Sequence, residues 1–354
     1  MREQSMRAGI SFRFDRSPNF FSLHAAHSPD NVTWIITAGS KVVASTSVVV
    51  RRAYVDQAVH TIAYLADLRQ AGGKRVAGAW RKAALFVLRE AQREYGATLT
   101  YCSILRDNRI ARSSILASRL GRRLGFRRLR GYKTVTLVGR LPWRRRSNSG
   151  LTVRCASTSD SDSLRQFVDR QSKDLQLSPV FENETWRHRL ERWPQFGIEN
   201  FLVAYDTEQR VVGCLAVWDS SAINRIVVDH LPPPAELLRR VANAGAMFTG
   251  RPRIPVGPDS CMPDVALTHI RIADRDPRVF AALIDAAYTQ QIKARRCATL
   301  SLCLYDDDPL WAGLRHTIHS TIPMDVYWAP LTAGTDGASI ERNDLWPGFE
   351  PYLV

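Results

Sequence analysis

The apolar positions of residues 1–140 follow strand spacing in some runs and helix spacing in others. Two runs rich in β-branched residues, 32–37 and 41–52, are separated by Ala38, Gly39 and Ser40, which predicts a β-hairpin. The same rules predict, in order, a strand at 61–70, an amphipathic helix at 77–95, a strand at 97–105, a helix at 109–123 and a strand at 132–138. The order is therefore hairpin, strand, helix, strand, helix, strand.

The second half repeats this order with different residues. A short strand is predicted at 151–156, and residues 160–176 have helical spacing. There follow a hairpin over 201–206 and 210–218, a strand at 265–272, a helix at 278–293, a strand at 298–305, a short helix at 309–316 and a strand at 324–328. The pattern predicts an α/β protein built from two copies of one unit, each with a mixed, mostly antiparallel sheet flanked by helices.

A polar segment separates the two copies. Residues 139–150 read GRLPWRRRSNSG, in which proline, three consecutive arginines and a Ser/Asn/Gly run interrupt every periodicity. We therefore predict a first domain at 1–140, a basic linker at 141–150, a second domain at 151–332 and a C-terminal tail at 333–354.

The composition is that of a soluble globular protein of two ordinary domains. The chain has 354 residues, of which 45% are hydrophobic and 23% are charged. No apolar run approaches the roughly 20 residues of a membrane span, and the start of the chain does not have the pattern of a secretory signal. A cytoplasmic protein without membrane contact is the expectation.

The charge is divided unevenly between the two halves. Residues 1–150 hold 28 Lys and Arg against 8 Asp and Glu, a net charge of +20, whereas the remainder has a net charge of −5. A positive field favours anions such as CoA phosphates, acidic substrates or nucleic acid, although it could equally belong to a solvated, arginine-rich surface.

The cysteines and histidines do not predict a metal site. The six cysteines are scattered without a C-x-x-C pair, and we expect most of them to be buried as small hydrophobic residues. His316 and His319 could share one face of a helix, but no acidic or thiolate partner lies in register with them. No metal is expected.

One segment of the first half carries recognisable chemistry. From Ala63 it reads AYLADLRQAGGKRVAGAWRKAALFVLREAQREYGATLTYCSILRDN, which predicts strand, glycine-containing turn, helix and strand. The turn fits the pattern Q/R-x-x-G-x-G/A at Arg75 and Gly78, and departs from it at the last position, where Trp80 stands. The intervening positions are Val76, Ala77 and Ala79.

The segment resembles the acyl-CoA binding core of the GCN5-related N-acetyltransferases, and the whole chain resembles a tandem pair of such domains. Asn108 and the pair Gly125 and Phe126 follow in the family's order. The resemblance implies acetyl-CoA, or another acyl-CoA, as cofactor, with its pyrophosphate held at the turn and by the amino end of the helix. A glycine needed only for close helix packing is the alternative explanation of Gly78.

The resemblance also implies a reaction, in which an amine attacks the thioester directly. Backbone amides around Leu68, Arg69 and Gln70, at the end of a strand splayed from its neighbour, would polarise the carbonyl, and Asn108 would meet the pantetheine arm. Tyr64 and Asp67 are the catalytic candidates on this strand. They are three residues apart and so lie on opposite faces unless the strand bulges. Burial would raise the pKa of Asp67 towards that of a useful base, although a structural hydrogen-bonding role is equally open.

Two features depart from the family's pattern. The tyrosine that usually protonates the thiolate would fall at Ile115 or Gly121, and Ser113 and Ser114 nearby are poor acids. In the second half, residues 273–282 read ADRDPRVFAA, without the glycine turn. We therefore expect a degenerate second copy that helps shape the substrate cleft, with His269 in a structural role.

Three functions remain open at this stage. The favoured one is transfer of an acyl group, most often acetyl in this family, to a small-molecule or protein amine. The alternatives are a transferase of the same fold that uses aminoacyl-tRNA, and a non-catalytic module that binds acyl-CoA or nucleic acid. Nucleic-acid binding suits the basic first half but is not favoured, because few aromatic residues are interspersed among the arginines. The sequence does not decide whether the chain forms a homodimer.

Overall fold

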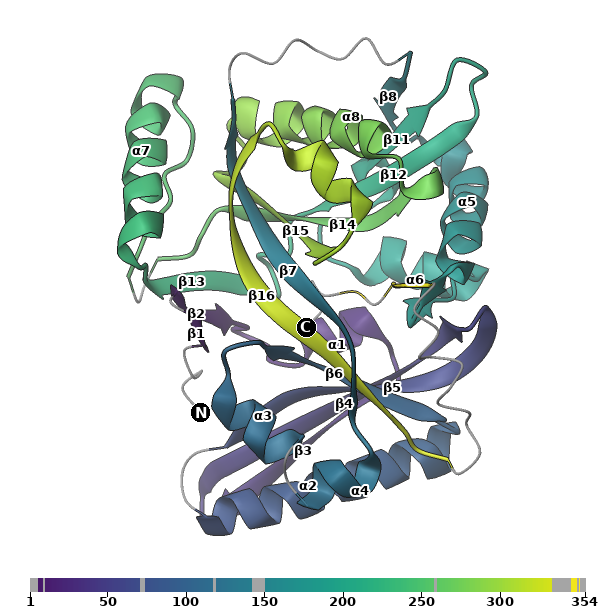
Figure 1. Ribbon diagram of the computed structural model, residues 1–354, viewed down its shortest axis with the longest axis vertical. Helices are drawn as coiled ribbons and strands as arrows, with labels where there is room; N and C mark the ends of the chain where they lie inside the picture. Colours follow the sequence, from purple (N-terminus) through teal and green to yellow (C-terminus); the bar gives the residue numbers. More distant parts are fainter. Residues whose placement is uncertain are drawn as a thin grey trace.

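The computed structural model describes residues 6–8, 10–70, 74–116, 119–141, 150–257, 260–332, 345–348 and 350. Twelve strands form one mixed sheet that continues through both halves of the chain (Figure 1). Its order is β10-β4-β5-β6-β16-β7-β15-β14-β12-β11-β8, with β3 paired to β4. In the first half the strands are β3 (Asn31–Ala38), β4 (Lys41–Val55), β5 (Ala58–Gln70), β6 (Leu99–Leu105) and β7 (Arg127–Arg140). In the second half they are β8 (Thr152–Cys155), β10 (Ser178–Pro179), β11 (Phe201–Tyr205), β12 (Val211–Trp218), β14 (Asp264–Ile272), β15 (Thr299–Tyr305) and β16 (Thr317–Pro330).

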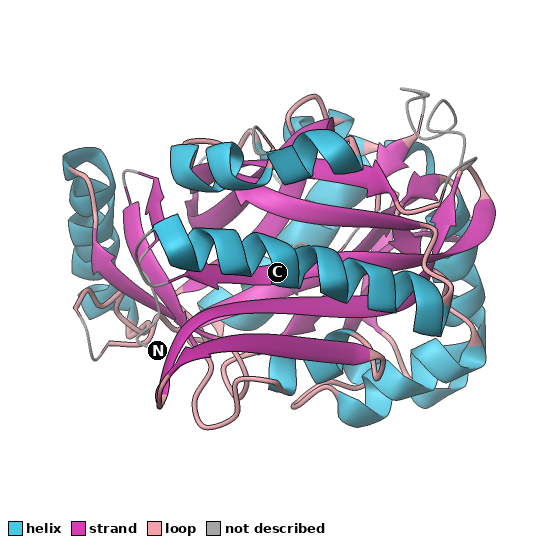
Figure 2. Cartoon of the chain, turned by 90° about the horizontal axis from the view of Figure 1, so that it is seen from below, coloured by secondary structure: helices cyan, strands magenta, loops and turns pink. Residues whose placement is uncertain are grey.

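Helices cover both faces of this sheet (Figure 2). The first half contains α1 (Ser22–His27), α2 (Lys74–Tyr95), α3 (Arg109–Ile115) and α4 (Arg119–Leu124). The second half contains α5 (Ser161–Lys173), α6 (Asn183–Arg192), α7 (Pro233–Thr249) and α8 (Pro277–Tyr288). The predicted helix at 109–123 is thus two short helices. No helix in the described part of the chain is long and apolar enough to cross a membrane.

The apolar face of each long helix explains its place. On α2, Ala84, Val87, Leu88 and Ala91 are buried against β4, β5 and β6. On α8, Val279, Phe280, Leu283 and Ile284 form the corresponding core with strands of the second half. Helical spacing of the apolar residues therefore places the same element on the sheet in both halves.

The two halves complete each other's sheets. Strand β16, near the end of the chain, lies between β6 and β7: residues 324–330 pair with β6, and residues 317–328 pair with β7. Strand β7 in turn pairs with β15 of the second half through residues 132–137. The sequence predicted short terminal strands at 132–138 and 324–328, but each strand has 14 residues and can serve both halves. The predicted linker at 141–150 divides the chain, while the sheet continues across it; residues 142–149 lie outside the described residues.

A small second layer was not predicted. Strands β1 (Met6–Ala8), β2 (Ile10–Asp15) and β13 (Arg225–His230) form a three-stranded sheet. Strand β13 and α7 belong to a segment between β12 and β14 that has no counterpart between β4 and β5. Because β13 pairs with β2, this segment joins the second half to the beginning of the first half.

The end of the chain returns to the interface between the halves. Strand β17 (Trp346–Pro347) pairs in parallel with β9 (Leu175–Gln176), and Glu350 is buried. The rest of the predicted tail lies outside the described residues.

The possible pair of imidazoles at His316 and His319 does not share a helix. The short helix ends at Leu314, and His319 lies in β16, because the apolar alternation of that strand begins earlier than predicted. No group of side chains that could hold a metal ion occurs in the described part of the chain.

Candidate functional site

The parallel strands β5 and β6 separate part of the way along their length. Their paired residues are Ile62 with Leu99, Ala63 with Thr100 and Tyr64 with Tyr101, and the described pairing ends there. Beyond it, Arg69 and Gln70 pair with β4 on the other side. The end of β5, with Leu68, Arg69 and Gln70, is therefore splayed from β6, as the family resemblance implied.

A β-bulge lies within the splayed part of β5. Ala66 pairs with Ser47, but Arg69 pairs with Ser45, so three steps along β5 match two along β4. Asp67 is at the bulge, with φ of 48° in the left-handed region. The bulge brings Tyr64 and Asp67 to the same element, α1.

The contacts with α1 show this change of side. The ring of Tyr64 lies 5.6 Å from that of His27, and the carboxylate of Asp67 lies 2.7 Å from His24 Nε2. Simple alternation, which predicts opposite faces for Tyr64 and Asp67, is therefore wrong, because the strand bulges.

Asp67 is surrounded by two arginines and a histidine. Its carboxylate lies 2.6 Å from Arg16 Nη1, 2.7 Å from His24 Nε2 and 3.0 Å from Arg69 Nη2. Burial alone would raise the pKa of Asp67, but the hydrogen bond from His24 and the charges of Arg16 and Arg69 outweigh it and hold that pKa well below its ordinary value. The expectation of a raised pKa is therefore wrong, and the carboxylate is ionised and engaged.

Two aromatic side chains mark the point where the strands part. Tyr64 and Tyr101 are both buried, with ring centroids 4.9 Å apart. Burial raises the pKa of Tyr64 well above its usual range, and burial raises that of Tyr101 to about 12 against the effect of Arg51, whose Nη2 donates to the Tyr101 hydroxyl at 3.0 Å. Both phenols therefore keep their protons at neutral pH.

His27 is a neutral group beside this pair. Burial and the charge of Arg51 lower the pKa of His27 well below its usual value. Among the described residues, neither ring nitrogen of His27 has a hydrogen-bond partner. No sequence pattern pointed to His27, because it lies in a region without clear periodicity. Strand alternation could have placed Tyr101 beside Tyr64.

The helix that follows begins earlier than predicted. Helix α2 starts at Lys74, so Arg75, Val76, Ala77, Gly78, Ala79 and Trp80 lie in its first two turns rather than in a preceding turn. Unpaired backbone N–H groups in such a first turn point along the helix axis and attract anions. The side chains of Arg75, Ala77 and Trp80 lie outside the described residues.

The surroundings of Gly78 bear on why a glycine is present. A Cβ placed on Gly78 would meet no atom within 4 Å. Close packing therefore does not require this glycine.

Asn108 is engaged at the start of α3. Its Oδ1 accepts a hydrogen bond from the backbone N–H of Ala111 at 2.9 Å, so it caps the helix. Ser113 Oγ donates to the carbonyl of Ile110, and the side chain of Ser114 lies outside the described residues.

The second half repeats the splay and the bulge. Strands β14 and β15 pair in parallel only from Asp264 with Thr299 to Ala266 with Ser301. Three residues later His269 has φ of 49°, at a shift in register against β12. His269 is buried, and its Nε2 lies 2.8 Å from Arg189 Nη1.

The amino end of α8 differs from that of α2. The carboxylate of Asp276 accepts a hydrogen bond from the backbone N–H of Arg278 at 2.8 Å, and the Arg278 guanidinium forms an ion pair with the same carboxylate. An acidic cap thus occupies the position where a phosphate would bind.

Glu350 fills the region next to His269. Its carboxylate bonds to Arg189, with Nη2 at 2.6 Å, and forms an ion pair with Arg51 Nη1 of β4 at 2.7 Å. Burial would raise the pKa of Glu350, but the two guanidinium groups hold it well below its usual value. Glu350, with Pro347 and Gly348, therefore leaves a cavity of only about 60 Å³ at the second splay.

Comparison with known proteins supports the fold. No family model and no curated protein matches the chain. A GCN5-related N-acetyltransferase from Sphaerobacter thermophilus is similar in structure, with a TM-score of 0.50, 13% identity, and coverage of 86% of this chain and 82% of that one. The chain has the fold of the GCN5-related N-acetyltransferases.

Two further solved structures are similar at lower scores. One is a GCN5-related N-acetyltransferase from Anabaena variabilis ATCC 29413, with a TM-score of 0.47, 11% identity, and coverage of 89% of this chain and 72% of that one. The other is a conserved protein of unknown function from Enterococcus faecalis V583, described as a probable N-acyltransferase, with a TM-score of 0.44, 8% identity, and coverage of 89% and 71%. At these identities the likeness concerns the fold alone.

Proposed function

We propose that the chain is an acyl-CoA-dependent N-acyltransferase with one active site, in its first half. The open space around Gly78, at the start of a helix that follows a splayed and bulged strand, is the observation that carries the proposal. An N-acetyltransferase using acetyl-CoA is the first form to test. Its acceptor is a small-molecule or protein amine.

Each part of the site has a role in this reaction. The first-turn amides of α2 hold the pyrophosphate, and Asn108 donates to the pantetheine arm. Amides of Leu68, Arg69 and Gln70 polarise the thioester carbonyl. The amine nitrogen attacks that carbon and loses a proton, the C–S bond breaks, and the departing thiolate takes up a proton.

The ionisation states support one assignment of the proton transfers. Tyr64 keeps its proton and is suited to protonate the thiolate rather than to act as a base. His27 is neutral and is suited to accept the proton of the amine, directly or through water. Asp67, engaged by Arg16 and His24, anchors α1 to the bulge and positions these groups rather than exchanging protons itself.

The second half is proposed to be a degenerate tandem copy. The recurrence of three parallel pairs, a splay and a bulge supports a common origin for the two units. The cap by Asp276 and the closure by Glu350 support the absence of a second acyl-CoA site.

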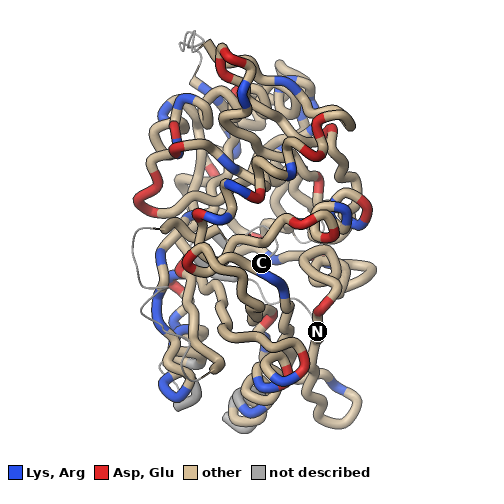
Figure 3. The backbone as a smooth tube through the Cα atoms, turned by 90° about the vertical axis from the view of Figure 1, so that its right-hand side faces the viewer, with Lys and Arg blue, Asp and Glu red and all other residues tan. Residues whose placement is uncertain are grey.

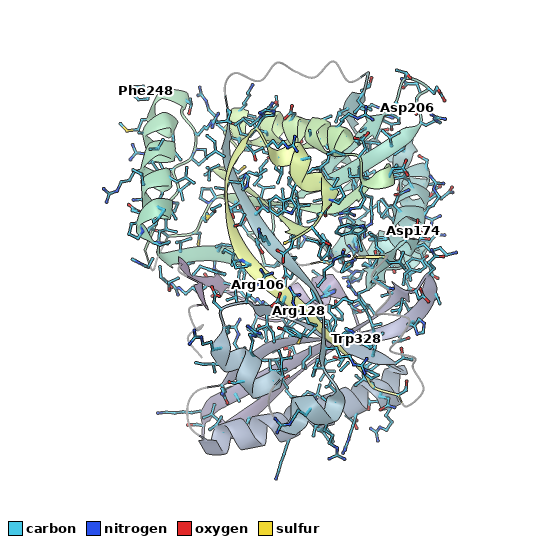
Figure 4. The ribbon with its side chains drawn as sticks, in the orientation of Figure 1. Arg106, Arg128, Asp174, Asp206, Phe248 and Trp328 are labelled. Atoms are coloured by element: carbon cyan, nitrogen blue, oxygen red, sulfur yellow. The ribbon has the colours of Figure 1, made fainter. Side chains whose placement is uncertain are left out.

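The basic first half has an explanation that does not involve tRNA. Basic residues dominate the lower part of the molecule in Figure 3, and most acidic segments lie above. Arg106 and Arg128 lie close to the crossing of β7 and β16 (Figure 4). Ion pairs join arginines of this region to aspartates of the second half: Arg106 with Asp306 and Asp325, Arg128 with Asp325, and Arg130 with Asp307. Part of the positive charge is thus used between the halves, which weakens the aminoacyl-tRNA alternative.

The test is acetyl-CoA binding by isothermal titration calorimetry. One site per chain is expected. Gly78→Glu should abolish binding, because it places a negative charge against the pyrophosphate, whereas Gly78→Gln, of the same size, should retain measurable affinity. Two equivalent sites, or equal affinities of the two variants, would contradict the proposal. A salt titration separates the alternatives, since nucleic-acid affinity falls far more steeply with salt.

A further inference from the structure

A cavity of about 220 Å³ lies between the small sheet and the large one. Its walls come from β2, from the segment containing β13 and α7, and from β7, β15 and β16 of the large sheet. Phe12, Phe14, Ile226, Leu238, Ile322 and Met324 line its apolar part. The cavity thus joins the beginning of the chain, the segment between β12 and β14, and the exchanged strands.

The size and lining of this cavity suit a small organic molecule. An apolar cavity of about 150 Å³ in another protein stays dry and binds benzene. The present cavity is larger and mostly apolar, so it can hold a ring with a short chain. Pockets of this kind orient their ligands through a few polar groups.

Asp264 provides such a group at one end. Thr299 Oγ1 lies 2.5 Å from Asp264 Oδ1, and Ser301 Oγ lies 2.9 Å from the same oxygen. No described side chain is bonded to Oδ2. Protein surrounds Asp264, but its side chain is only partly buried, because it forms part of the cavity wall.

The charges around Asp264 favour a cation. Asp219, which follows β12, adds a second negative charge nearby, and the Cys297 thiol keeps its proton because burial raises its pKa to about 12. Arg239, in the α7 wall, is neutralised by two bonds of 2.7 Å to Glu236. The charge of Arg251 also reaches the Cys297 thiol, whereas Thr299 and Ser301, which bond to Asp264, are uncharged.

The protonation of Asp264 responds to its surroundings. Burial raises its pKa to about 7, against the hydrogen bonds from Thr299 and Ser301, and Asp219 adds to the increase. A bound ammonium group would favour the ionised carboxylate.

We propose that this cavity binds an apolar molecule bearing one basic amine, with the ammonium group on Asp264 and the apolar part among the residues of α7, β2 and the sheet. This amine is not the one that would be acylated. Along β15 the cavity extends from Thr299 to the level of Tyr305. Tyr305 pairs with Tyr132, which lines the far end of the cavity. The six residues from one end to the other span about 20 Å of strand. Tyr132 bonds to Ser103 of β6, so only that distant end lies near the proposed acyl site.

The proposal is independent of acyl transfer and is tested without acyl-CoA. The probes are 2-phenylethylamine and its uncharged analogue 2-phenylethanol, titrated by calorimetry into the full chain. At pH 8 the amine should bind at least about tenfold more tightly than the alcohol. From pH 8 to pH 6 the affinity for the amine should fall by about tenfold as Asp264 becomes protonated, while that for the alcohol stays constant.

Two kinds of variant locate the binding. Asp264→Asn should make the two affinities equal, whereas Asp162→Asn, an exposed change on α5, should have no effect. Ala266→Phe fills the cavity and should abolish both; if it does not fold, Ala235→Leu on α7 provides the same test. Equal binding of amine and alcohol by the unaltered protein, failure of both to bind, or an unchanged preference in Asp264→Asn would each overturn the proposal.

Discussion

Asp67 and His269 occupy the same position in the two halves of the molecule. Each lies three residues beyond the last parallel pair of its strand, and their φ values are 48° and 49°. In one half the bulge presents a carboxylate to Arg16 and His24, and in the other an imidazole to Arg189. The same backbone device therefore supports a candidate acyl site in the first half and a closed interface in the second.

Asp67→Asn should destabilise the protein markedly. The change leaves Arg16 and Arg69 without their counter-charge, and loss of one partner of a buried ion pair costs roughly 3–5 kcal/mol. Urea denaturation at pH 7 measures this loss. Glu199→Gln, a change of the same type at an exposed position, is the control, and a stable Asp67→Asn variant would show that the anchor is unnecessary.

The stabilisation that Asp67 provides should depend on pH. The pKa of Asp67 is lower in the folded than in the unfolded state, so its stabilisation is complete above the unfolded value of about 4 and is lost as the pH falls further. The difference in unfolding free energy between wild type and Asp67→Asn should therefore be constant from pH 5 to 7 and shrink below pH 4. A difference that grows on acidification contradicts the assignment.

Tyr64→Phe separates catalysis from stability. If Tyr64 protonates the thiolate, its loss should lower kcat for acetyl transfer by about a hundredfold, with little change in Tm or in acetyl-CoA affinity. Tyr101→Phe, which removes the acceptor of the Arg51 hydrogen bond, should lower Tm with a smaller effect on kcat. Wild-type turnover in Tyr64→Phe removes the phenol from the mechanism.

A fragment ending at Ser149 should not fold alone. It lacks β16, so β6 and β7 lose the strand between them. Circular dichroism and size-exclusion chromatography of the fragment should show an aggregated or unfolded chain. Co-expression with residues 150–354 is the matched control and should restore a soluble complex. A monomeric, fully active fragment would refute the shared-sheet requirement.

Thiol labelling tests the packing of both halves. Cys155 and Cys261 are exposed, whereas burial raises the pKa of the other four thiols to about 12 (Cys102, Cys214, Cys297 and Cys303). Native protein should therefore gain two carbamidomethyl groups rapidly from iodoacetamide at pH 8, and six in denaturant, as measured by intact mass. Fast native labelling in Cys155→Ser/Cys261→Ser would contradict this packing.

Local elements could be predicted because their signals are contained in a few neighbouring residues. The hairpin at Ala38 to Ser40 and the helix predicted at 278–293, which begins at Pro277 and continues as a π-helix to Lys293, are confirmed. The exchange of β7 and β16 could not be predicted, because strand alternation indicates a strand but not which distant strand pairs with it.

In the candidate site, too, the features of one strand could be predicted, whereas those that depend on distant residues could not. Tyr64 and Asp67 were predicted from one strand, but the sign of the change in the pKa of Asp67 depends on Arg16 and His24, which come from a region without clear periodicity. The splay was anticipated by resemblance, while the bulge is visible only in the register with β4.

The position of β16 also sets the order in which the protein can be completed during synthesis. Arg106 and Asp325, joined across β6 and β16, are separated by 219 residues. A ribosome that has finished the first half has therefore made a sheet without its central strand, whose unpaired edges are exposed until nearly the whole chain has emerged. Such distant pairing folds slowly. The nascent first half is thus expected to depend on chaperones that shield strand edges, and slowing translation between the halves should lower the yield rather than improve it.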